Sequence, residues 1–237
     1  MLTVDFDYFD LQPGHVCVDL GCGEGRHSLT VYLQENVTVI GLDLSHQDLK
    51  TAQSRIADMA SYNPQGSVDF AQANGLSLPL ADHSVDRLIC SEVLEHIPNY
   101  IGFLEEIDRV LKPDGRVCIS VPRSWPERVC WSLCDAYRRT PGGHIRIFNA
   151  SHLSREVERY TLAETRRHGA HALHVPYWWL KCLFWHAKTE PFILKWYHRL
   201  LVWDLMKRPW LTRAIEAVTN PWLGKSVVLY FDRSEKH

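Results

Sequence analysis

The feature that most constrains the fold is a predicted strand that runs directly into a glycine-rich loop. The run VCVDLGCGEGRHSL (Val16 to Leu29) starts apolar and then carries glycine at alternate positions, namely Gly21, Gly23 and Gly25. Glycine has no Cβ, so such a loop lets the backbone approach a ligand closely before a helix begins near Arg26. Ordinary tight turns also contain glycine, so this segment needs support from its surroundings.

An acidic residue follows at the spacing that nucleotide-binding folds use. After a helix predicted over 26–34, a second apolar strand over 37–42 ends in Asp43, 18 positions beyond Gly25. In dinucleotide-type folds, an acid about 20 residues past the glycines accepts hydrogen bonds from ribose hydroxyls. Asp43 is therefore the predicted ribose ligand. The alternative is that Asp43 caps a helix predicted over 45–60, although Ser45 already supplies a capping group.

The glycine spacing separates two kinds of nucleotide ligand. NAD-type folds usually carry G-x-G-x-x-G, with a pyrophosphate at the helix N-terminus, whereas this loop reads G-x-G-x-G and contains Glu24. A carboxylate here would repel a pyrophosphate and suit a ligand with a sulfonium and an α-amino group. On these residues the chain resembles the class I S-adenosylmethionine-dependent methyltransferases. A nicotinamide oxidoreductase is disfavoured.

Four further motifs extend the resemblance over residues 16–122. They are VIGLDLS (Val39 to Ser45), ANGLSLPLADHSVD (Ala73 to Asp86), CSEVLEHI (Cys90 to Ile97) and EIDRVLKPDGRVCISVP (Glu106 to Pro122). The resemblance implies an α/β fold with a doubly wound, seven-stranded, mostly parallel Rossmann-like sheet. Nucleic-acid amino-methyltransferases generally have an Asn/Asp-Pro-Pro-aromatic turn after the fourth strand. The chain has Cys-Ser-Glu-Val there (90–93), which disfavours that class.

The same resemblance assigns S-adenosylmethionine as cofactor and implies its binding residues. The resemblance assigns Asp19 and the three loop glycines to the methionine portion of the cofactor and Asp43 to its ribose. It assigns Leu44, Asn74 and Gly75 to the adenine. Ser91 and Glu92, at the end of the fourth strand, are expected to face the cofactor. Asn74 stands where the family commonly has aspartate. Its amide oxygen can still accept a hydrogen bond, so we expect this contact to be retained but weaker.

Composition sets broad limits on partners and compartment. The chain has 237 residues and a formal net charge of −2, so nucleic acid is not an expected partner. Its seven cysteines have no C-x-x-C spacing and are expected to be reduced core thiols of a cytoplasmic protein, with no metal site. The first ten residues do not resemble a signal peptide, and no run of 18 apolar residues predicts a membrane-spanning helix.

Aromatic and basic residues gather near the end of the chain. All nine tryptophans follow Ser124, and the window 177–225 holds seven of them with eight basic residues against three acidic ones. Spacing over Phe192 to Lys207 predicts an amphipathic helix with Phe192, Trp196, Leu200 and Trp203 on one stripe. The stripe either completes the core over the sheet or provides peripheral membrane contact or a passage for an apolar substrate.

These segments define one methyltransferase domain over 1–237 with two additions. The first is an insertion after the fifth strand at 123–150, and the second is an aromatic and basic helical cap at 176–225. A sixth strand is predicted near 170–175 and an antiparallel seventh strand over 226–234. Ligands bind at the carboxyl ends of the strands in such sheets, so both additions can cover the site.

The predicted function is methyl transfer to a small-molecule acceptor that is hydrophobic or lipid-like. His144 in PGGHIRIF (141–148) is the candidate general base, because two glycines place it on a bend. The rival candidates are His96, Tyr137 and His152. A different class of function is also open at this stage, namely a catalytically silent protein with the cofactor fold that acts as a membrane-associated scaffold.

Overall fold

The computed structural model describes residues 2–34, 36–62 and 64–233, and its centre is a seven-stranded sheet. The strands are β1 (Val16–Leu20), β2 (Thr38–Asp43), β3 (Ser67–Gln72), β4 (Val85–Ser91), β5 (Leu111–Pro122), β6 (Leu162–Ala170) and β7 (Ser226–Arg233). Their order is β3-β2-β1-β4-β5-β7-β6, and β7 runs antiparallel to both of its neighbours. This confirms the predicted doubly wound sheet and its antiparallel last strand.

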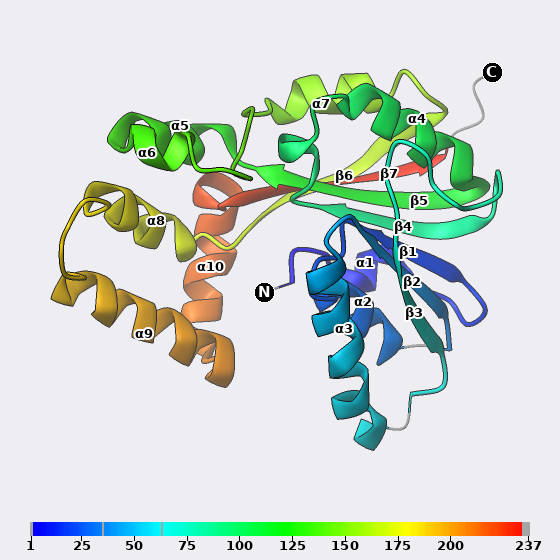
Figure 1. Cartoon of the computed structure of the whole chain (residues 1–237), viewed down its shortest axis with the longest axis horizontal. Coiled ribbons are helices and arrows are strands. Elements are labelled where there is room, and N and C mark those ends of the chain that lie inside the picture. Colours follow the sequence, from blue (N-terminus) through cyan, green and yellow to red (C-terminus); the bar gives the residue numbers. More distant parts are fainter. Residues whose placement is uncertain (1, 35, 63, 234–237) are drawn as a thin grey trace.

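Helices cover both faces of the sheet and extend beyond one end. They are α1 (Phe6–Phe9), α2 (Arg26–Tyr32), α3 (His46–Met59), α4 (Tyr100–Val110), α5 (Ser124–Leu133), α6 (Asp135–Arg138), α7 (Ala150–Val157), α8 (His174–Leu183), α9 (Phe192–Lys207) and α10 (Trp210–Leu223), with 3-10 turns η1 (Ala60–Tyr62) and η2 (Leu94–His96). Figure 1 shows α4 and α7 on one face and α1 to α3 on the other.

The sequence explains why β4 and α4 pack against each other. Six of the seven residues of β4 are buried, because both faces of this central strand are covered. In α4 the buried residues are Phe103, Leu104, Ile107 and Val110, which lie on one helix face. The helix begins at Asn99, whose Oδ1 accepts a hydrogen bond from the Gly102 amide at 3.2 Å. The carboxyl end of β4 is thereby held in the centre of the molecule.

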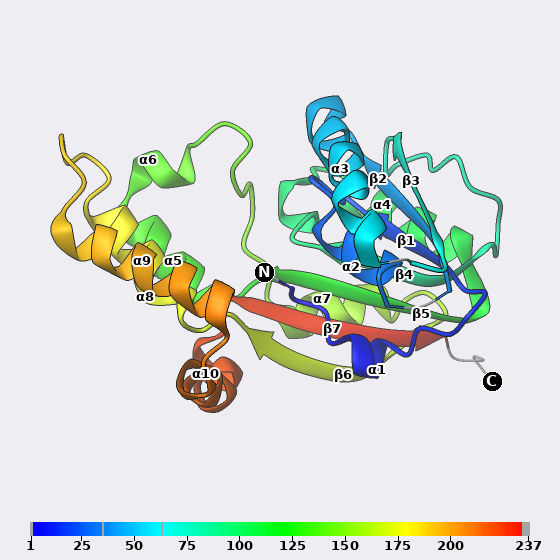
Figure 2. The ribbon, with the colours of Figure 1, turned by 90° about the horizontal axis from the view of Figure 1, so that it is seen from below.

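The additions after β5 and β6 form a helical lobe beyond the carboxyl ends of the parallel strands. Helices α5, α6, α8 and α9 lie together at that end, and α10 returns beside β6 (Figures 1 and 2). Buried Cys130, Cys134 and Cys182 form a small core of this lobe with three tryptophans. All seven cysteines of the chain are free and buried, as predicted. No helix among the described residues is long and apolar enough to cross a membrane.

Two local predictions differ from the structure. The sixth strand is Leu162–Ala170 rather than 170–175, where the chain turns and enters α8. The apolar stripe of α9 does not complete the core either, because Leu194 and Leu201 are its buried residues and Trp196 and Trp203 are exposed. The helix bounds themselves are as predicted, since Pro191 precedes the first turn and Pro209 follows the last.

Candidate functional site

The main candidate site is a pocket of about 760 Å³ at the carboxyl ends of β1, β2 and β4. Six of the predicted cofactor residues line it, namely Gly21, Asp43, Leu44, Asn74, Gly75 and Glu92. Its other lining residues include Asp48, Leu76, Val93, His96, Phe103 and Gly142, which the sequence analysis did not assign to the cofactor. Such an edge, where the strand order reverses on either side of β1, is where doubly wound sheets bind ligands.

The glycine loop requires glycine for steric reasons. Gly21 has a φ of 76°, and a Cβ built there would lie 2.3 Å from Val93 Cγ2. Gly25 has a φ of 79° and directly precedes α2. L-residues rarely adopt this left-handed backbone, whereas glycine does so without steric cost. The loop therefore turns tightly from β1 into α2 and exposes its backbone at the pocket.

Asp43 links the second strand to the glycine loop. Its Oδ2 accepts a hydrogen bond from the Gly23 amide, and its Oδ1 accepts one from the Ser45 amide, both at 2.8 Å. The Oγ of Ser45 accepts a hydrogen bond from the Asp48 amide at 3.3 Å and so caps the first turn of α3. Capping is thus the role of Ser45. Each Asp43 oxygen keeps a lone pair for a further donor in the pocket.

An apolar wall faces the loop that carries Asn74 and Gly75. Leu44 is 61% exposed although it lines the pocket. A Cβ at Gly75 would lie 2.0 Å from Phe103 Cε2, so the backbone passes directly over the ring of Phe103. Asn74 Oδ1 accepts a hydrogen bond from the Leu76 amide at 3.0 Å, which fixes this turn. A flat apolar ring can therefore be held between Leu44 and the 74–76 backbone.

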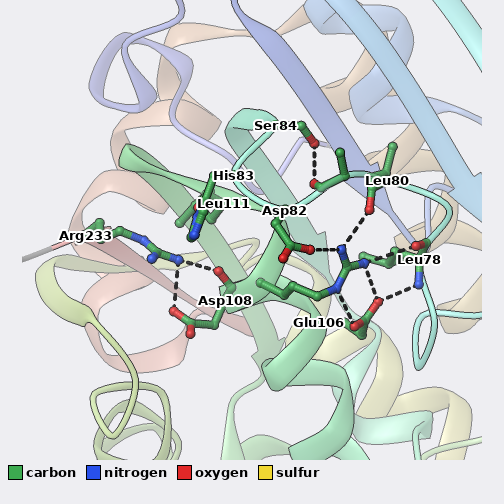
Figure 3. Close-up of polar contacts among 11 residues, drawn as sticks. Leu78, Leu80, Asp82, His83, Ser84, Glu106, Asp108, Leu111 and Arg233 are labelled. Atoms are coloured by element: carbon green, nitrogen blue, oxygen red, sulfur yellow. Dashed lines mark hydrogen bonds and ion pairs between the residues drawn. The ribbon is translucent and has the colours of Figure 1, made fainter.

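Arg109 of α4 anchors the loop that follows Gly75. Its guanidinium donates to the carbonyl oxygens of Leu80 and Leu78 at 2.8 and 3.1 Å and pairs with Asp82 and Glu106 (Figure 3). Glu106 Oε2 in turn accepts from the Leu78 amide at 2.6 Å. This network holds the loop against α4 and so fixes one wall of the pocket.

Four predicted cofactor residues do not line the pocket, namely Asp19, Gly23, Gly25 and Ser91. Asp19 is buried, and its Oδ2 accepts hydrogen bonds from the amide and hydroxyl of Ser28 at 2.9 and 2.6 Å. Burial raises the pKa of Asp19 to about 6. Ser91 Oγ forms hydrogen bonds with the hydroxyls of Thr3 and Ser120. In this arrangement Asp19 and Ser91 position the loop and strand behind the pocket.

Glu24 has a different role from the one its position in the loop suggested. Its carboxylate pairs with Arg55 of α3, and Arg55 also donates to the Glu24 carbonyl oxygen at 3.0 Å. Glu24 is not among the pocket-lining residues. Its charge is therefore paired with Arg55 at the surface and does not face the pocket. Glu92 is the acid that faces the pocket just after β4, with a φ of 58° that non-glycine residues seldom adopt.

His144 lies beside the pocket mouth in a hydrogen-bonded cluster. Its Nδ1 is 2.7 Å from Glu127 Oε1, an oxygen that also accepts from Trp131 Nε1 at 3.1 Å and from the Tyr137 hydroxyl at 3.0 Å. Burial alone would raise the pKa of Glu127, but the hydrogen bond and charge of His144 hold it below its usual value. An ionised carboxylate can only accept, so His144 donates to Glu127 through Nδ1.

Glu95 and His96 complete this cluster. The Nε2 atoms of His144 and His96 each lie 3.9 Å from Glu95 Oε1. Glu95 is 1% exposed, and neither of its carboxylate oxygens has a hydrogen-bond partner among the described residues. Burial and the charge of Glu92 raise the pKa of Glu95 well above its usual value.

The rival base candidates divide by location. Tyr137 and His96 belong to the His144 cluster, and His96 and Gly142 line both the main pocket and the adjoining one that contains His144. His152 lies on α7 beside Glu156 and does not line either pocket. Sequence reasoning missed Glu127, because the PGGH bend carries no signal for a helix residue 17 positions earlier.

Comparison with known proteins agrees with this geometry. Residues 18–119 match the family model described as a methyltransferase domain. With this match, the seven-stranded sheet and the pocket, the chain has the domain and fold of a class I S-adenosylmethionine-dependent methyltransferase. The cofactor of this class is S-adenosylmethionine.

Individual relatives share the same part of the chain. The chain is 39% identical over 107 residues to demethylmenaquinone methyltransferase of Lactococcus lactis (43% of this chain, 40% of that one). It is 32% identical over 115 residues to methyltransferase GfsG of Streptomyces halstedii (48% and 40%). It thus matches less than half the length of these curated relatives. The structure superposes on a crystal structure of a methyltransferase from Methanosarcina mazei over 100% of each chain, with a TM-score of 0.66 and 14% sequence identity. This similarity supports the fold.

The pocket fits this cofactor on its own chemistry. The carboxylates of Asp43 and Glu92 suit hydroxyl and cationic groups, respectively, and exposed Leu44 offers an apolar surface to an aromatic ring. A side chain at position 75 would clash with the ring of Phe103. Glycine at this position therefore lets the 74–76 backbone lie directly against the pocket wall that Phe103 forms. The residues that would hold the cofactor are therefore Gly21, Asp43, Leu44, Asn74, Gly75 and Glu92.

Proposed function

We propose that this protein transfers a methyl group from S-adenosylmethionine to a hydroxyl group of a small hydrophobic acceptor, with His144 as general base. The observation that carries the proposal is the Glu127-oriented imidazole beside the mouth of the cofactor pocket. When bound, the cofactor supplies an electrophilic methyl group on a sulfonium. A hydroxyl nucleophile needs its proton removed as it attacks, and a histidine is the usual group for this task.

The roles of the cluster follow from its hydrogen bonds. His144 Nε2 accepts the proton of the acceptor hydroxyl, while Glu127 holds the ring through Nδ1 and stabilises the imidazolium that forms. Trp131 and Tyr137 hold Glu127 in place by donating to the same oxygen. Because Glu127 and His144 are largely buried, the proton transfer occurs away from bulk water.

Aromatic rings pack behind His144 in the helical lobe, and Trp131 lines the same pocket as His144. The ring of Tyr137 lies 6.5 Å from that of His144 and 5.8 Å from each of Trp178 and Trp185. One relative is named a demethylmenaquinone methyltransferase. From that name we take only the class of acceptor, a ring with an isoprenoid tail, as part of the proposal for this chain. An isoprenoid phenol or hydroquinone combines an apolar tail with a hydroxyl of the required kind.

The test of this proposal compares cofactors first and acceptors second. In isothermal titration we expect the protein to bind S-adenosylmethionine and not NADH. With radiolabelled cofactor, we expect methylation of a phenol carrying an isoprenoid tail and weaker methylation of the same phenol without the tail. Cofactor binding with no product from any phenolic or total-lipid substrate would favour the silent scaffold, and failure to bind the cofactor would overturn the proposal.

We also propose peripheral membrane contact through residues 177–225. The outward stripe of α9 presents Phe192, Trp196, Trp203 and Met206, of which Phe192 is 80% exposed. Helix α10 adds further exposed apolar residues. The same segment has six exposed basic residues, namely Lys188, Lys195, Arg199, Lys207, Arg208 and Arg213. Aromatic and basic side chains on one helix face suit an anionic lipid surface, which would also supply an apolar acceptor.

We expect the protein to sediment with vesicles that contain anionic phospholipid at low salt, and to be released as salt rises. Each basic side chain near the surface contributes about 1 kcal/mol before screening. The double variant Trp196→Ala/Trp203→Ala should sediment less. Tyr62→Ala, which removes a more exposed aromatic ring from η1, outside the 177–225 segment, should behave like the wild type. Absence of sedimentation at low salt would contradict membrane contact.

A further inference from the structure

A second cluster of titratable side chains lies outside the methyltransferase pocket. It comprises His171 in the turn after β6, His174 in the first turn of α8 and Glu216 of α10. One ligand atom from each residue lies within 4.8 Å of the other two. Elements distant in the sequence meet here, because the Ala172 amide donates to Asn220 Oδ1 at 2.9 Å and so ties the turn to α10 (Figure 1).

The polar atoms of this cluster lack partners. His171 Nε2, His174 Nδ1 and Glu216 Oε1 are each buried and have no hydrogen bond among the described residues. A buried polar atom without a partner costs free energy, so one such atom on each of three neighbouring residues needs an explanation. His171 also has a φ of 64°, a backbone conformation that is uncommon outside glycine and is found more often at functional positions.

We propose that His171, His174 and Glu216 bind a divalent transition-metal ion of the Zn²⁺ type. Two imidazoles and one carboxylate are a known zinc ligand set that leaves a further position open. A cavity of about 570 Å³ adjoins the three residues, with Asp204 and three arginines, Arg26, Arg208 and Arg213, also on its wall. An ion held by the three ligands would lie at the wall of this cavity. Asp204 would offset part of the positive charge of the arginines.

The ion would tie together the turn after β6, α8 and α10, which supply His171, His174 and Glu216. Arg26 is the first residue of α2 and follows the glycine loop directly, and it lines the same cavity as these three residues. The proposed site therefore lies beside the start of α2. The site lies in the part of the chain beyond residues 18–119, so it is independent of the methyltransferase match.

The test uses the full-length protein after removal of metal by a chelator. We expect one equivalent of Zn²⁺ to bind in a competition assay with a chromophoric chelator, and Co²⁺ to give the visible absorption of a four- or five-coordinate site. Loss of a residue that only orients a metal ligand typically costs 10–100-fold in affinity. Removal of a ligand itself in His174→Ala or Glu216→Gln should therefore weaken Zn²⁺ binding by about 100-fold or more.

A matched control separates this site from the cluster of Glu95, His96 and His144, which also groups possible ligands. His144→Ala should bind Zn²⁺ as the wild type does. Circular dichroism and S-adenosylmethionine titration report whether each variant is folded, and Glu216→Gln keeps the shape of the side chain. Failure of the wild type to bind Zn²⁺, or loss of binding in His144→Ala but not in the other two variants, would overturn the proposal.

Discussion

His144→Ala should lower kcat by about 100-fold or more while leaving affinity for S-adenosylmethionine unchanged. General base catalysis contributes about 10²- to 10⁴-fold. Glu127 holds Nδ1 of His144, whereas Nδ1 of His96, the other imidazole of the cluster, contacts the Gly143 carbonyl oxygen. The measurement is steady-state turnover with a saturating acceptor, together with cofactor titration. Unchanged turnover would remove His144 from the mechanism.

Two further variants test how the base is held. Glu127→Gln keeps the shape of the side chain but replaces the carboxylate that orients His144, so we expect a fall in kcat with little change in KM for the cofactor. It should also shift the pH profile of kcat, because the charge beside the imidazole is lost. His152→Ala serves as the control, since His152 lies on α7 outside both pockets, and its turnover should match the wild type.

Asp43→Ala should weaken S-adenosylmethionine binding by about 1.5 to 3 kcal/mol, the range expected for loss of a charged hydrogen-bond acceptor. The same change frees the Gly23 and Ser45 amides, so the loop also loses an anchor. Asp43→Asn should lose less, because an amide oxygen remains. Asp58→Ala, an exposed acid on α3, should bind the cofactor normally. Isothermal titration gives the comparison, and wild-type affinity in Asp43→Ala would refute the ribose assignment.

The parts of the fold that the sequence predicted are those with strong local signals. The Gly21 to Gly25 loop and Asp43 were recognisable because each follows an apolar strand. The bounds of α9 were readable because a proline lies at each end. The strand β6 was misplaced because it lies at the sheet edge and reads LAETRRHGA, whose central residues are polar and alternate between half-buried and exposed. An edge strand needs no continuous apolar run, so periodicity did not reveal it.

The site was predictable only where a single motif carries it. Six of the predicted cofactor residues line one pocket, and Asp19 and Ser91 form hydrogen bonds behind it. The pairing of His144 with Glu127 depends on how α5 folds back on the 141–148 bend, which no spacing rule encodes. His171, His174 and Glu216 come together for the same reason, since their meeting depends on where α10 crosses β6.

The place where the aromatic cap joins the sheet has a consequence for how this protein can change. Ala170, the last residue of β6, pairs directly with Ser226, the first residue of β7. The segment 171–225 therefore leaves the sheet and rejoins it at the same end of the hydrogen-bonded β6–β7 pair. Its length and sequence can diverge without altering the register of any strand. The aromatic cap can thus diverge, or be exchanged between relatives, while the strands that carry the main pocket stay in place.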